Sequence, residues 1–370
     1  MKILVIAPSV TRPYLGPSVA AYNTLAGFLK ISRELERNEV KITFLSINDG
    51  SGSRVIDENI EVVAQKRIHA FWLPREIQGL ITMRKGFDLV HSHDICEVFP
   101  YFLSKLPVIL TLHGIFWREI RFKKGIYPKI WLNLGELRLR GYYSKLARFV
   151  AISQYMVEEL QKKGLDISKA EVIENPINDD FFNVRKNEEP IIVYPATLLP
   201  LKNQLGFLKA VALVRKELGE YKIKLVGSGD STYESKLREY IKCNDLPVEF
   251  LGKVPYEEMP RIYSTASIVV LTSFQENMPM SILEAFATGT PVLASNVGGI
   301  PFVVRNYDTG LLTNPSDQKD IADKLLILVN DHNLRRKMGE RAREEALGRW
   351  KSETIARKLL SLYLSMKALQ

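Results

Sequence analysis

The chain has 370 residues, of which 46% are hydrophobic and 25% are charged, a balance typical of a soluble globular protein with room for two domains. No apolar run approaches the roughly 18–20 residues that span a bilayer, which argues against a membrane-spanning protein. The formal net charge is +9, and the two cysteines, Cys96 and Cys243, are too few for a disulfide framework, so a reducing cytoplasm is the expected compartment.

The first half alternates short apolar runs rich in Val and Ile with helix-patterned stretches, which predicts a parallel α/β sheet. Residues 1–8 contain an apolar run too short for the core of a signal peptide, so they are expected to form the first buried strand. The strands expected in this half are 2–7, 40–47, 60–64, 88–91, 107–112, 149–152 and 171–173.

Basic and aromatic residues are concentrated in one stretch of the first half, 116–149. Between Arg118 and Arg148, nine basic residues are opposed only by Glu119 and Glu136. Bases together with aromatics suit a surface that dips into the headgroup layer of an anionic membrane. Two alternatives stay open: a solvated helix face with its aromatics turned inward, and a nucleic-acid surface, which is less favoured because no nucleic-acid motif accompanies the charge.

The second half repeats the alternation after a polar stretch, 183–190, that is expected to be a linker. Its expected strands are 191–195, 222–226, 248–251, 268–271, 292–294 and 310–312. From about residue 321 the chain is helical and charged. A second doubly wound sheet is therefore predicted, and such sheets bind ligands at the carboxyl ends of their strands.

Two carboxylates eight positions apart, Glu276 and Glu284, are the most informative feature of the second half. Glu276 follows an apolar strand, whereas Glu284 lies in a short apolar helix that is expected to end at Gly289. A buried glutamate needs strong hydrogen bonds, which the adjacent hydroxyl groups of a sugar or a ribose would supply. The alternative is a partly exposed Glu284 on a rim and a Glu276 favoured by the helix dipole.

The surroundings of this pair carry a family resemblance. They read Val248-Glu-Phe-Leu-Gly252 before the pair, and Thr290-Pro-Val and Gly298-Gly299-Ile-Pro301 after it. The segment closely resembles the donor-binding half of the retaining GT-B glycosyltransferases that carry the E-x7-E motif. The resemblance covers nearly all of the chain and is dense from about residue 190 to 315.

The resemblance implies the GT-B fold, in which two Rossmann-like, doubly wound parallel-sheet domains face a central cleft. Residues 1–185 would form the acceptor-binding domain, and residues 190–350 the domain that binds the nucleotide-sugar donor. Residues 351–370 would form a helix that crosses back to the first domain.

The catalytic residues that the resemblance implies are Glu276, His113 and Lys202. Glu276 would contact hydroxyl groups of the transferred sugar, and His113, at the end of a buried strand, would lie beside it. Lys202 follows a strand and precedes a helix, where a cation and a helix N-terminus both favour phosphate, so it would stabilise the departing diphosphate.

The donor-binding residues implied in the same way include Glu284, which would hold the ribose hydroxyls. The backbone N–H groups of Asn277 and Met278 would line the phosphate side, and Gly227 would form a glycine turn near the nucleotide. Gly16, in the loop 12–19 after the first strand, matches a paired-glycine loop that approaches the donor phosphates.

Three positions depart from the family pattern. Thr197 stands where an arginine is usual, five positions before Lys202, and it supplies a hydrogen bond but no charge. Pro17 replaces the second glycine of the phosphate loop and removes a backbone donor. Phe302 stands where an acid often follows Pro301, a change from which no catalytic loss is inferred.

Alternating His91, His93 and Asp94 at the end of a strand are possible metal ligands, but the sequence contains no second cluster of ligands. It also contains no D-x-D motif, so no metal bridging the diphosphate is expected. The expected reaction therefore uses no metal and no cofactor, with the nucleotide-diphosphate sugar as co-substrate.

The function expected from these observations is glycosyl transfer with retention, from a nucleotide-diphosphate sugar to a lipid-linked or other membrane-associated glycan. The expected location is the cytoplasm, with peripheral attachment to the inner face of the membrane through 116–149. A non-catalytic nucleotide-sugar binder and a nucleotide-sugar hydrolase or epimerase on the same fold remain alternatives. An oxidoreductase is disfavoured because Gly227-Ser-Gly229 does not continue as a dinucleotide fingerprint.

Overall fold

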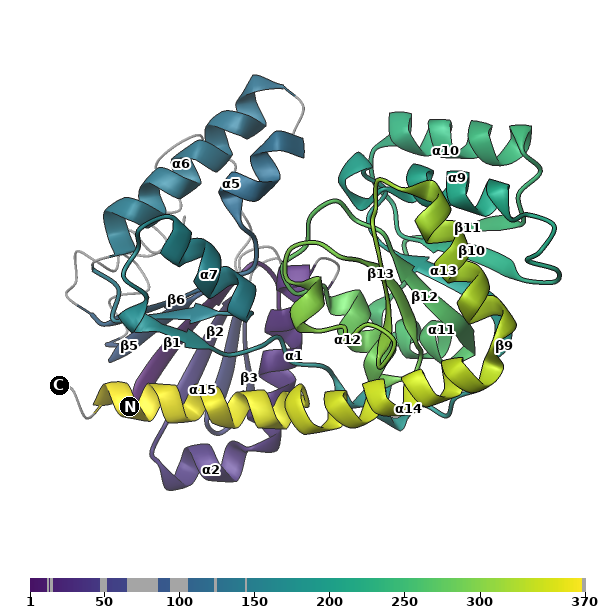
Figure 1. The fold of residues 1–370 in the computed structure, drawn as a ribbon. Helices are drawn as coiled ribbons and strands as arrows, with labels where there is room; N and C mark the ends of the chain where they lie inside the picture. The colour runs from purple at the N-terminus through teal and green to yellow at the C-terminus, as the bar shows by residue number, and fades with distance from the viewer. Residues whose placement is uncertain are drawn as a thin grey trace. The chain divides into compact units, whose positions relative to one another are not determined.

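The computed structural model describes residues 1–11, 13, 16–46, 52–64, 86–93, 106–122, 125–143 and 145–367. The chain divides into two compact units (Figure 1), an N-terminal unit of Met1–Asn178 with Trp350–Gln370 and a C-terminal unit of Asp179–Arg349. None of the helices in the described part of the chain is long and apolar enough to cross a membrane.

The N-terminal unit is built on an eight-stranded sheet with the order β3-β4-β2-β1-β5-β6-β7-β8. All neighbouring strands pair in parallel except β3, which runs antiparallel to β4. The strands are β1 (Lys2–Ala7), β2 (Lys41–Ser46), β3 (Gly52–Asp57), β4 (Ile60–Ala64), β5 (Leu89–Ser92), β6 (Val108–Leu112), β7 (Arg148–Ala151) and β8 (Ala170–Val172).

Helices accompany these strands in the right order for βαβ units. They are α1 (Gly16–Lys30), α2 (Ser32–Arg37), α5 (Phe116–Glu119), α6 (Ile126–Tyr143), α7 (Gln154–Lys162) and α15 (Ser352–Lys367), with the short 3-10 helices η2 (Ile120–Phe122) and η3 (Ile167–Lys169). Residues 12, 14 and 15 of the expected phosphate loop, and Asp94, Cys96, Lys123 and Lys124, lie outside the described residues.

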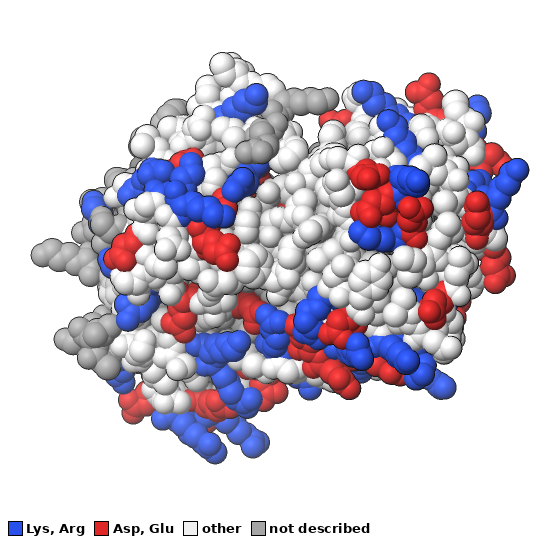
Figure 2. All heavy atoms as spheres, viewed as in Figure 1, with Lys and Arg blue, Asp and Glu red and all other residues white. Residues whose placement is uncertain are grey.

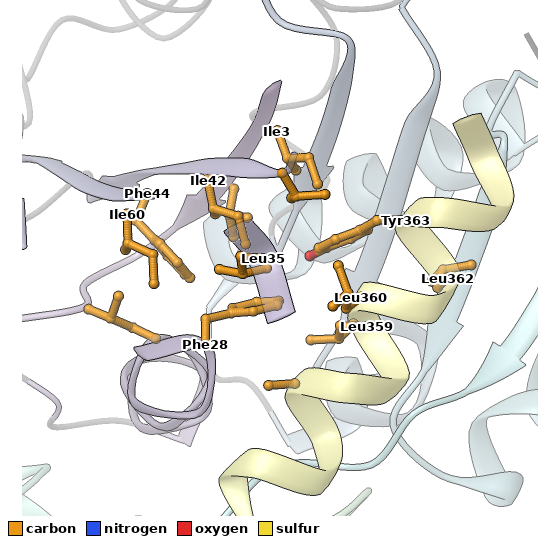
Figure 3. Close-up of a cluster of buried hydrophobic side chains, with 14 of the residues drawn as sticks. Ile3, Phe28, Leu35, Ile42, Phe44, Ile60, Leu359, Leu360, Leu362 and Tyr363 are labelled. Carbon is orange, nitrogen blue, oxygen red and sulfur yellow. The ribbon is translucent and has the colours of Figure 1, made fainter. Parts of the chain in front are cut away.

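The last helix, α15, completes the core of the N-terminal unit. It packs against α1, where a Cβ on Gly27 would lie 2.2 Å from the carbonyl oxygen of Ser352, so only glycine permits this approach. Figure 3 shows Tyr363 and Leu360 of α15 projecting toward Ile3 of β1, in a buried cluster that also contains Phe28 of α1. Burying this apolar face is the main reason that the helix docks here.

The C-terminal unit is built on a six-stranded parallel sheet with the order β11-β10-β9-β12-β13-β14. The strands are β9 (Glu189–Pro195), β10 (Lys222–Val226), β11 (Val248–Gly252), β12 (Ala266–Leu271), β13 (Val292–Ser295) and β14 (Gly310–Thr313). The helices are α8 (Asp179–Asn183), η4 (Pro200–Lys202), α9 (Gln204–Leu213), α10 (Ser231–Cys243), η5 (Tyr256–Glu258), α11 (Met259–Thr265), α12 (Met280–Ala287), η6 (Ile300–Phe302), α13 (Gln318–Asn330) and α14 (His332–Arg349).

Every strand expected from the sequence is present within about two residues of its expected bounds, and both sheets have the predicted doubly wound order. The antiparallel strand β3 was not predicted, because its side chains are mostly exposed and give no apolar pattern. The polar stretch 183–190 lies in the C-terminal unit, where the Lys186 ammonium donates to Tyr263 O at 3.3 Å and Thr290 Oγ1 at 2.6 Å. The expected acceptor and donor roles of the units stay predictions.

Candidate functional site

The strand order of the C-terminal unit determines where its candidate site residues lie. In doubly wound sheets, ligands bind where the strand order reverses, at the carboxyl ends of the strands. Here the order reverses between β9 and β12, which pair directly. Lys202 ends η4 in the loop after β9, and Glu276 lies in the loop after β12, so two residues 74 positions apart meet at this point.

Lys202 and Glu276 form an ion pair in which the ammonium nitrogen lies 2.6 Å from Glu276 Oε1. The lysine side chain is 23% exposed and that of the glutamate 9%, so the pair lies at the edge of the protein interior rather than free in solvent. A cation in this position can reach a ligand without first leaving a buried site. The arrangement suits an anionic group that replaces the glutamate as the partner of Lys202.

The two loops are joined by buried hydrogen bonds beneath the ion pair. The hydroxyl of Tyr194, on β9, donates to the carbonyl oxygen of Lys202 and accepts from the backbone N–H of Thr272 at 3.0 Å. The Asn203 amide donates to Thr272 O at 3.1 Å, and Phe274 N–H donates to Leu201 O at 2.9 Å. These bonds fix the backbone on both sides of the ion pair.

Two glycines fix the loop that carries Glu276 from its other side. A Cβ on Gly298 would lie 2.0 Å from Glu276 O, and one on Gly299 would lie 1.8 Å from Asn277 O. Gly299 N–H also donates to Glu276 O at 3.1 Å. Both positions therefore need glycine, because the backbone at 298–299 closely approaches the backbone at 276–277. Asn277 and Met278 are buried.

Gly227 and Thr197 meet at the carboxyl ends of β9 and β10. Gly227 has φ +139°, and a Cβ there would lie 2.4 Å from Ala196 O, so this position also needs glycine. The carbonyl oxygen of Thr197 accepts from the Gln204 amide at 3.0 Å, which ties this loop to the start of α9. Thr197 and Gly227 thus line the same edge of the sheet as Lys202.

Glu284 is held inside the unit rather than on its rim. Its side chain belongs to α12, the residue is 5% exposed, and the Tyr263 hydroxyl donates to Oε2 at 2.8 Å. Burial raises the pKa of this carboxyl to about 7, although hydrogen bonds from Tyr263 and Tyr256 act in the opposite direction. The partly exposed alternative is therefore wrong, and α12 ends as expected, with Gly289 at φ +72°.

The N-terminal unit holds the third catalytic candidate, His113, directly after β6. Its Nε2 lies 2.9 Å from Nδ1 of His93, which follows β5, and the two rings are stacked. Burial lowers the pKa of His93 to about 4 and, with the neighbouring His93, that of His113 to about 3, so both imidazoles are neutral at neutral pH.

His91 belongs to the core rather than to a metal site. Its Nδ1 lies 2.6 Å from the Tyr363 hydroxyl and its Nε2 lies 2.7 Å from Thr111 Oγ1, so both ring nitrogens are engaged. Among the described residues, no group of three or more His, Cys, Asp or Glu side chains is arranged to hold a metal ion.

Gly16, the phosphate-loop candidate, is the first residue of α1, and a Cβ there would meet no atom within 4 Å. Pro17 and Val19 follow in the first turn of the helix, where proline is well tolerated. Gly16 and His113 lie in one unit, and Lys202, Glu276 and Glu284 lie in the other.

Sequence reasoning missed Tyr194 and Tyr263, whose hydroxyls hold the Lys202 loop and Glu284. Both are fully buried tyrosines in apolar surroundings. In a sequence they are indistinguishable from aromatic core residues, because only the tertiary contacts reveal where the hydroxyl points.

Comparison with known proteins places the chain in a family. The model of the glycosyl transferases group 1 family matches residues 177–345, and that of glycosyltransferase family 4 matches residues 28–181. The N-acetyl-alpha-D-glucosaminyl L-malate synthase of Bacillus anthracis is 31% identical over 302 residues, covering 76% of each chain. The chain is a group 1 glycosyltransferase.

Solved structures share the fold of this glycosyltransferase over its whole length. Sucrose-phosphate synthase from Thermosynechococcus elongatus superposes with a TM-score of 0.77 at 19% identity, covering 100% of both chains. The Anabaena protein HepE in complex with UDP-glucose superposes with a TM-score of 0.76 at 19% identity, covering 99% of this chain and 100% of that one. The expected GT-B fold is confirmed.

Proposed function

We propose that this glycosyltransferase moves a sugar from a nucleoside diphosphate sugar, bound by the C-terminal unit, to an acceptor bound by the N-terminal unit. The observation that carries the proposal is the Lys202–Glu276 ion pair at the point where the strand order reverses, 2.6 Å between the charged atoms. A lysine cation can bind a diphosphate, and a carboxylate can accept hydrogen bonds from sugar hydroxyls. The ammonium of Lys202 and the carboxylate of Glu276 lie side by side. The structure of HepE with UDP-glucose is consistent with a donor of this class.

In the proposed reaction, the bond between the anomeric carbon and the diphosphate breaks and a bond from an acceptor oxygen to that carbon forms. Lys202 stabilises the charge that grows on the departing diphosphate. Glu276 accepts hydrogen bonds from the transferred sugar, His113 lies beside it, and Glu284 holds the ribose hydroxyls. Gly16, Thr197, Gly227, Asn277 and Met278 complete the donor-binding set.

The proposal includes retention of configuration and no metal ion. Retention is supported by the E-x7-E motif, Glu276 to Glu284. The acceptor proton passes to an oxygen of the departing phosphate, so no protein base is required. His113 and His93 fit such a route, because their lowered pKa values keep them uncharged rather than poised to exchange protons at neutral pH.

A nucleotide screen tests the donor assignment. Thermal shift with UDP, GDP, ADP, CMP and dTDP should give stabilisation by one base, since ligand at about 100 times its Kd adds roughly 2.7 kcal/mol. Lys202→Ala should reduce that shift, whereas Lys209→Ala, at an exposed position on α9, should not. Absence of any shift with every nucleotide and its sugars would overturn the donor site. Binding without sugar transfer would favour the non-catalytic alternative, and free sugar formed without acceptor would favour the hydrolase.

For the acceptor we propose a lipid-linked or membrane-associated glycan, reached from the inner face of an anionic membrane through α6. The exposed side of this helix combines apolar residues with Lys129; among its described side chains, the exposed large hydrophobic ones are Ile126, Tyr127, Ile130 and Leu137. Figure 2 shows basic side chains gathered over the part of the N-terminal unit where Figure 1 places α6 and α7. Such a helix can bury its apolar residues at the membrane interface while its bases contact lipid phosphates.

Part of the basic stretch does not serve this surface. Arg118 turns to Glu159, with its Nε 2.6 Å from Oε2 of that buried carboxylate, and the Trp117 indole donates to the same oxygen at 3.1 Å. Arg140 lies 3.3 Å from Glu136. Fewer positive charges are therefore free to contact lipid phosphates than the sequence predicts. A smaller basic surface weakens the membrane assignment. The second candidate acceptor is a small soluble anion, since the name of the Bacillus relative contains L-malate.

Flotation with liposomes separates the two acceptor classes. With vesicles of phosphatidylglycerol and phosphatidylcholine at low salt, the wild type should float, and Ile130→Ser with Leu137→Ser should reduce binding several-fold. Leu213→Ser, at an exposed apolar position of α9 in the other unit, is the matched control. A wild type that stays in the aqueous layer at low salt would contradict the membrane assignment and leave the soluble anion.

A further inference from the structure

A small, partly open cavity lies in the N-terminal unit beside the His93–His113 pair. Its volume is about 20 Å³, and a single water needs roughly 10–15 Å³ of such space. The wall includes Ala20 and Thr24 of α1, His93, Glu174 and Asn175. Most of the wall is apolar, its polar groups come from a few residues that include both His93 and His113, and the space is large enough for one water molecule.

His93 lines this cavity and carries a buried nitrogen that lacks a hydrogen-bond partner among the described residues. The residue is 8% exposed, and its Nδ1 is engaged by His113 at 2.9 Å. Its Nε2 is buried and has no hydrogen-bond partner among the described residues. Leaving a buried imidazole nitrogen unsatisfied costs roughly 1–3 kcal/mol, so an occupant with hydrogen-bonding capacity is strongly favoured here.

The bond between the two rings makes their protonation states interdependent. A neutral imidazole carries one N–H and one bare nitrogen, and the contact between His93 Nδ1 and His113 Nε2 needs one proton. Two arrangements are possible. In the first arrangement, His113 donates from Nε2, and His93 carries its own proton on Nε2. In the second arrangement, His93 donates from Nδ1, and His113 carries its own proton on Nδ1.

The charge of the cavity wall favours the first arrangement, in which His93 carries its proton on Nε2. Glu174 is a carboxylate in the cavity wall, and the ammonium nitrogen of Lys358 lies 3.8 Å from its Oε2. A negative wall favours an N–H that points into the cavity over a bare nitrogen. His91 does not compete for an occupant, because Tyr363 and Thr111 engage both of its nitrogens.

We propose that this cavity holds one ordered water that accepts the Nε2–H of His93, and that His93 thereby fixes the proton of His113 on Nε2. His93 is then a positioning residue. It leaves the buried Nδ1 of His113 as a bare hydrogen-bond acceptor, which suits a hydroxyl donor and does not suit a phosphate oxygen. The significance for sugar transfer rests on the proposed function, whereas the tautomers and the water do not.

The chain has five histidines, so selective ¹⁵N-histidine labelling gives a spectrum that single substitutions can assign. In the unliganded wild type at pH 7, His93 and His113 should both show the Nε2–H tautomer. The His93 Nε2–H should exchange magnetisation with a bound water. A His93 with its proton on Nδ1, or no contact with water, would overturn the proposal.

Two variants separate positioning from simple structural support. Ala20→Val narrows the cavity and should shift His93 and His113 toward the Nδ1–H tautomer; unchanged tautomers would overturn the role of the water. His93→Asn keeps an acceptor near the Nδ1 position and should leave His113 protonated on Nε2. His93→Leu should abolish that preference, and a His113 that keeps it would contradict the positioning role.

Activity is read separately from the spectra. If the proposed function holds, His93→Leu should lower kcat about tenfold at unchanged nucleotide affinity, and His93→Asn should retain most of kcat. A protein that binds no nucleotide but shows the expected tautomers would remove the proposed function and leave the water site intact. Equal kcat values for the Leu and Asn variants would overturn the link between His93 and catalysis.

Discussion

At the level of single residues, Lys202 and Glu276 neutralise each other in the unliganded C-terminal unit. In the proposed complex, a diphosphate competes with the carboxylate of Glu276, now 2.6 Å away, for the ammonium of Lys202. The proposal then has the same glutamate accept hydrogen bonds from sugar hydroxyls. On this proposal, each member of the ion pair occupies the position that one part of the donor would take, and Thr197 adds no charge beside it.

Substitution of Glu276 by Gln tests this competition. It removes the negative charge that holds Lys202, so the affinity for a nucleoside diphosphate without sugar should rise several-fold. Sugar transfer should fall at least about a hundredfold, because the hydroxyl contacts are weakened. Isothermal titration with the nucleotide and a transfer assay measure the two effects.

The control for this experiment is Glu340→Gln, which breaks an exposed ion pair with Arg336 on α14, 2.9 Å in the wild type. Exposed pairs contribute little, so this variant should resemble the wild type in both assays. Weaker binding of the nucleoside diphosphate to Glu276→Gln would contradict the competition between the diphosphate and the carboxylate.

At the level of elements, Tyr194 joins β9, the 3-10 helix η4 and the loop after β12. Its hydroxyl bonds to Lys202 O and Thr272 N, and Thr272 Oγ1 lies 3.1 Å away. The phenol is buried, and its one oxygen satisfies two backbone groups. These contacts hold η4 and the loop after β12 rigidly together. The position of the Lys202 backbone therefore depends on a buried tyrosine from the preceding strand.

Tyr194→Phe should weaken binding of the nucleoside diphosphate about tenfold, because the Lys202 loop loses its fixed position. Each buried hydrogen bond lost with the hydroxyl lowers the free energy of unfolding by about 1 kcal/mol, and the variant should still fold. In a Lys202→Ala background the same change should have little further effect on binding, as expected for residues that act as a unit. Titration of the four proteins gives the coupling.

Tyr221→Phe is the matched control, since its hydroxyl lies 3.5 Å from Val329 O, between β10 and α13. It should change stability slightly and nucleotide affinity not at all. If Tyr194→Phe lowered nucleotide affinity equally with and without Lys202, the Tyr194 hydroxyl would stabilise the unit in general rather than position the lysine.

At the level of the whole molecule, the two units should respond to acid in opposite ways. His93 and His113 have pKa values of about 4 and about 3, below the ordinary 6.5, so the unfolded chain binds more protons than the folded chain as the pH falls below 6.5. Their contribution to stability is complete above 6.5 and is lost toward pH 4. Glu284, with a raised pKa of about 7, gains stability in the same window.

Hydrogen exchange between pH 7 and 4.5 should therefore show weakening protection in β5 and β6 but not in β12 and β13. Between about pH 6.5 and 4.5, each of the two histidines contributes roughly 1.4 kcal/mol per pH unit to this loss of stability. The Glu159 carboxyl, with a pKa of about 2, belongs to the N-terminal unit and loses its contribution only below about pH 4.5. Equal loss of protection in both units would contradict the assignment to the histidines.

The strands could be predicted because each is a short apolar run between polar stretches, as in Ile3–Ala7 and Val292–Ala294, whose residues are buried on both faces. The strand β3 could not, because exposed residues such as Val55 leave no pattern. The candidates Glu276, Glu284 and Lys202 came from the family resemblance. Their roles remain proposals, whereas the closeness of Lys202 and Glu276 is now observed.

The sequence by itself determined the two doubly wound sheets, the short helix ending at Gly289 and the residues at the strand ends, because periodicity and turn chemistry are local properties. Only the tertiary structure decided that Lys202 pairs with Glu276, that Tyr194 and Tyr263 hold the site, and that Arg118 turns inward to Glu159. Each of these contacts joins segments far apart in the chain. Strand order brings them together, and no local pattern encodes which side chains then meet.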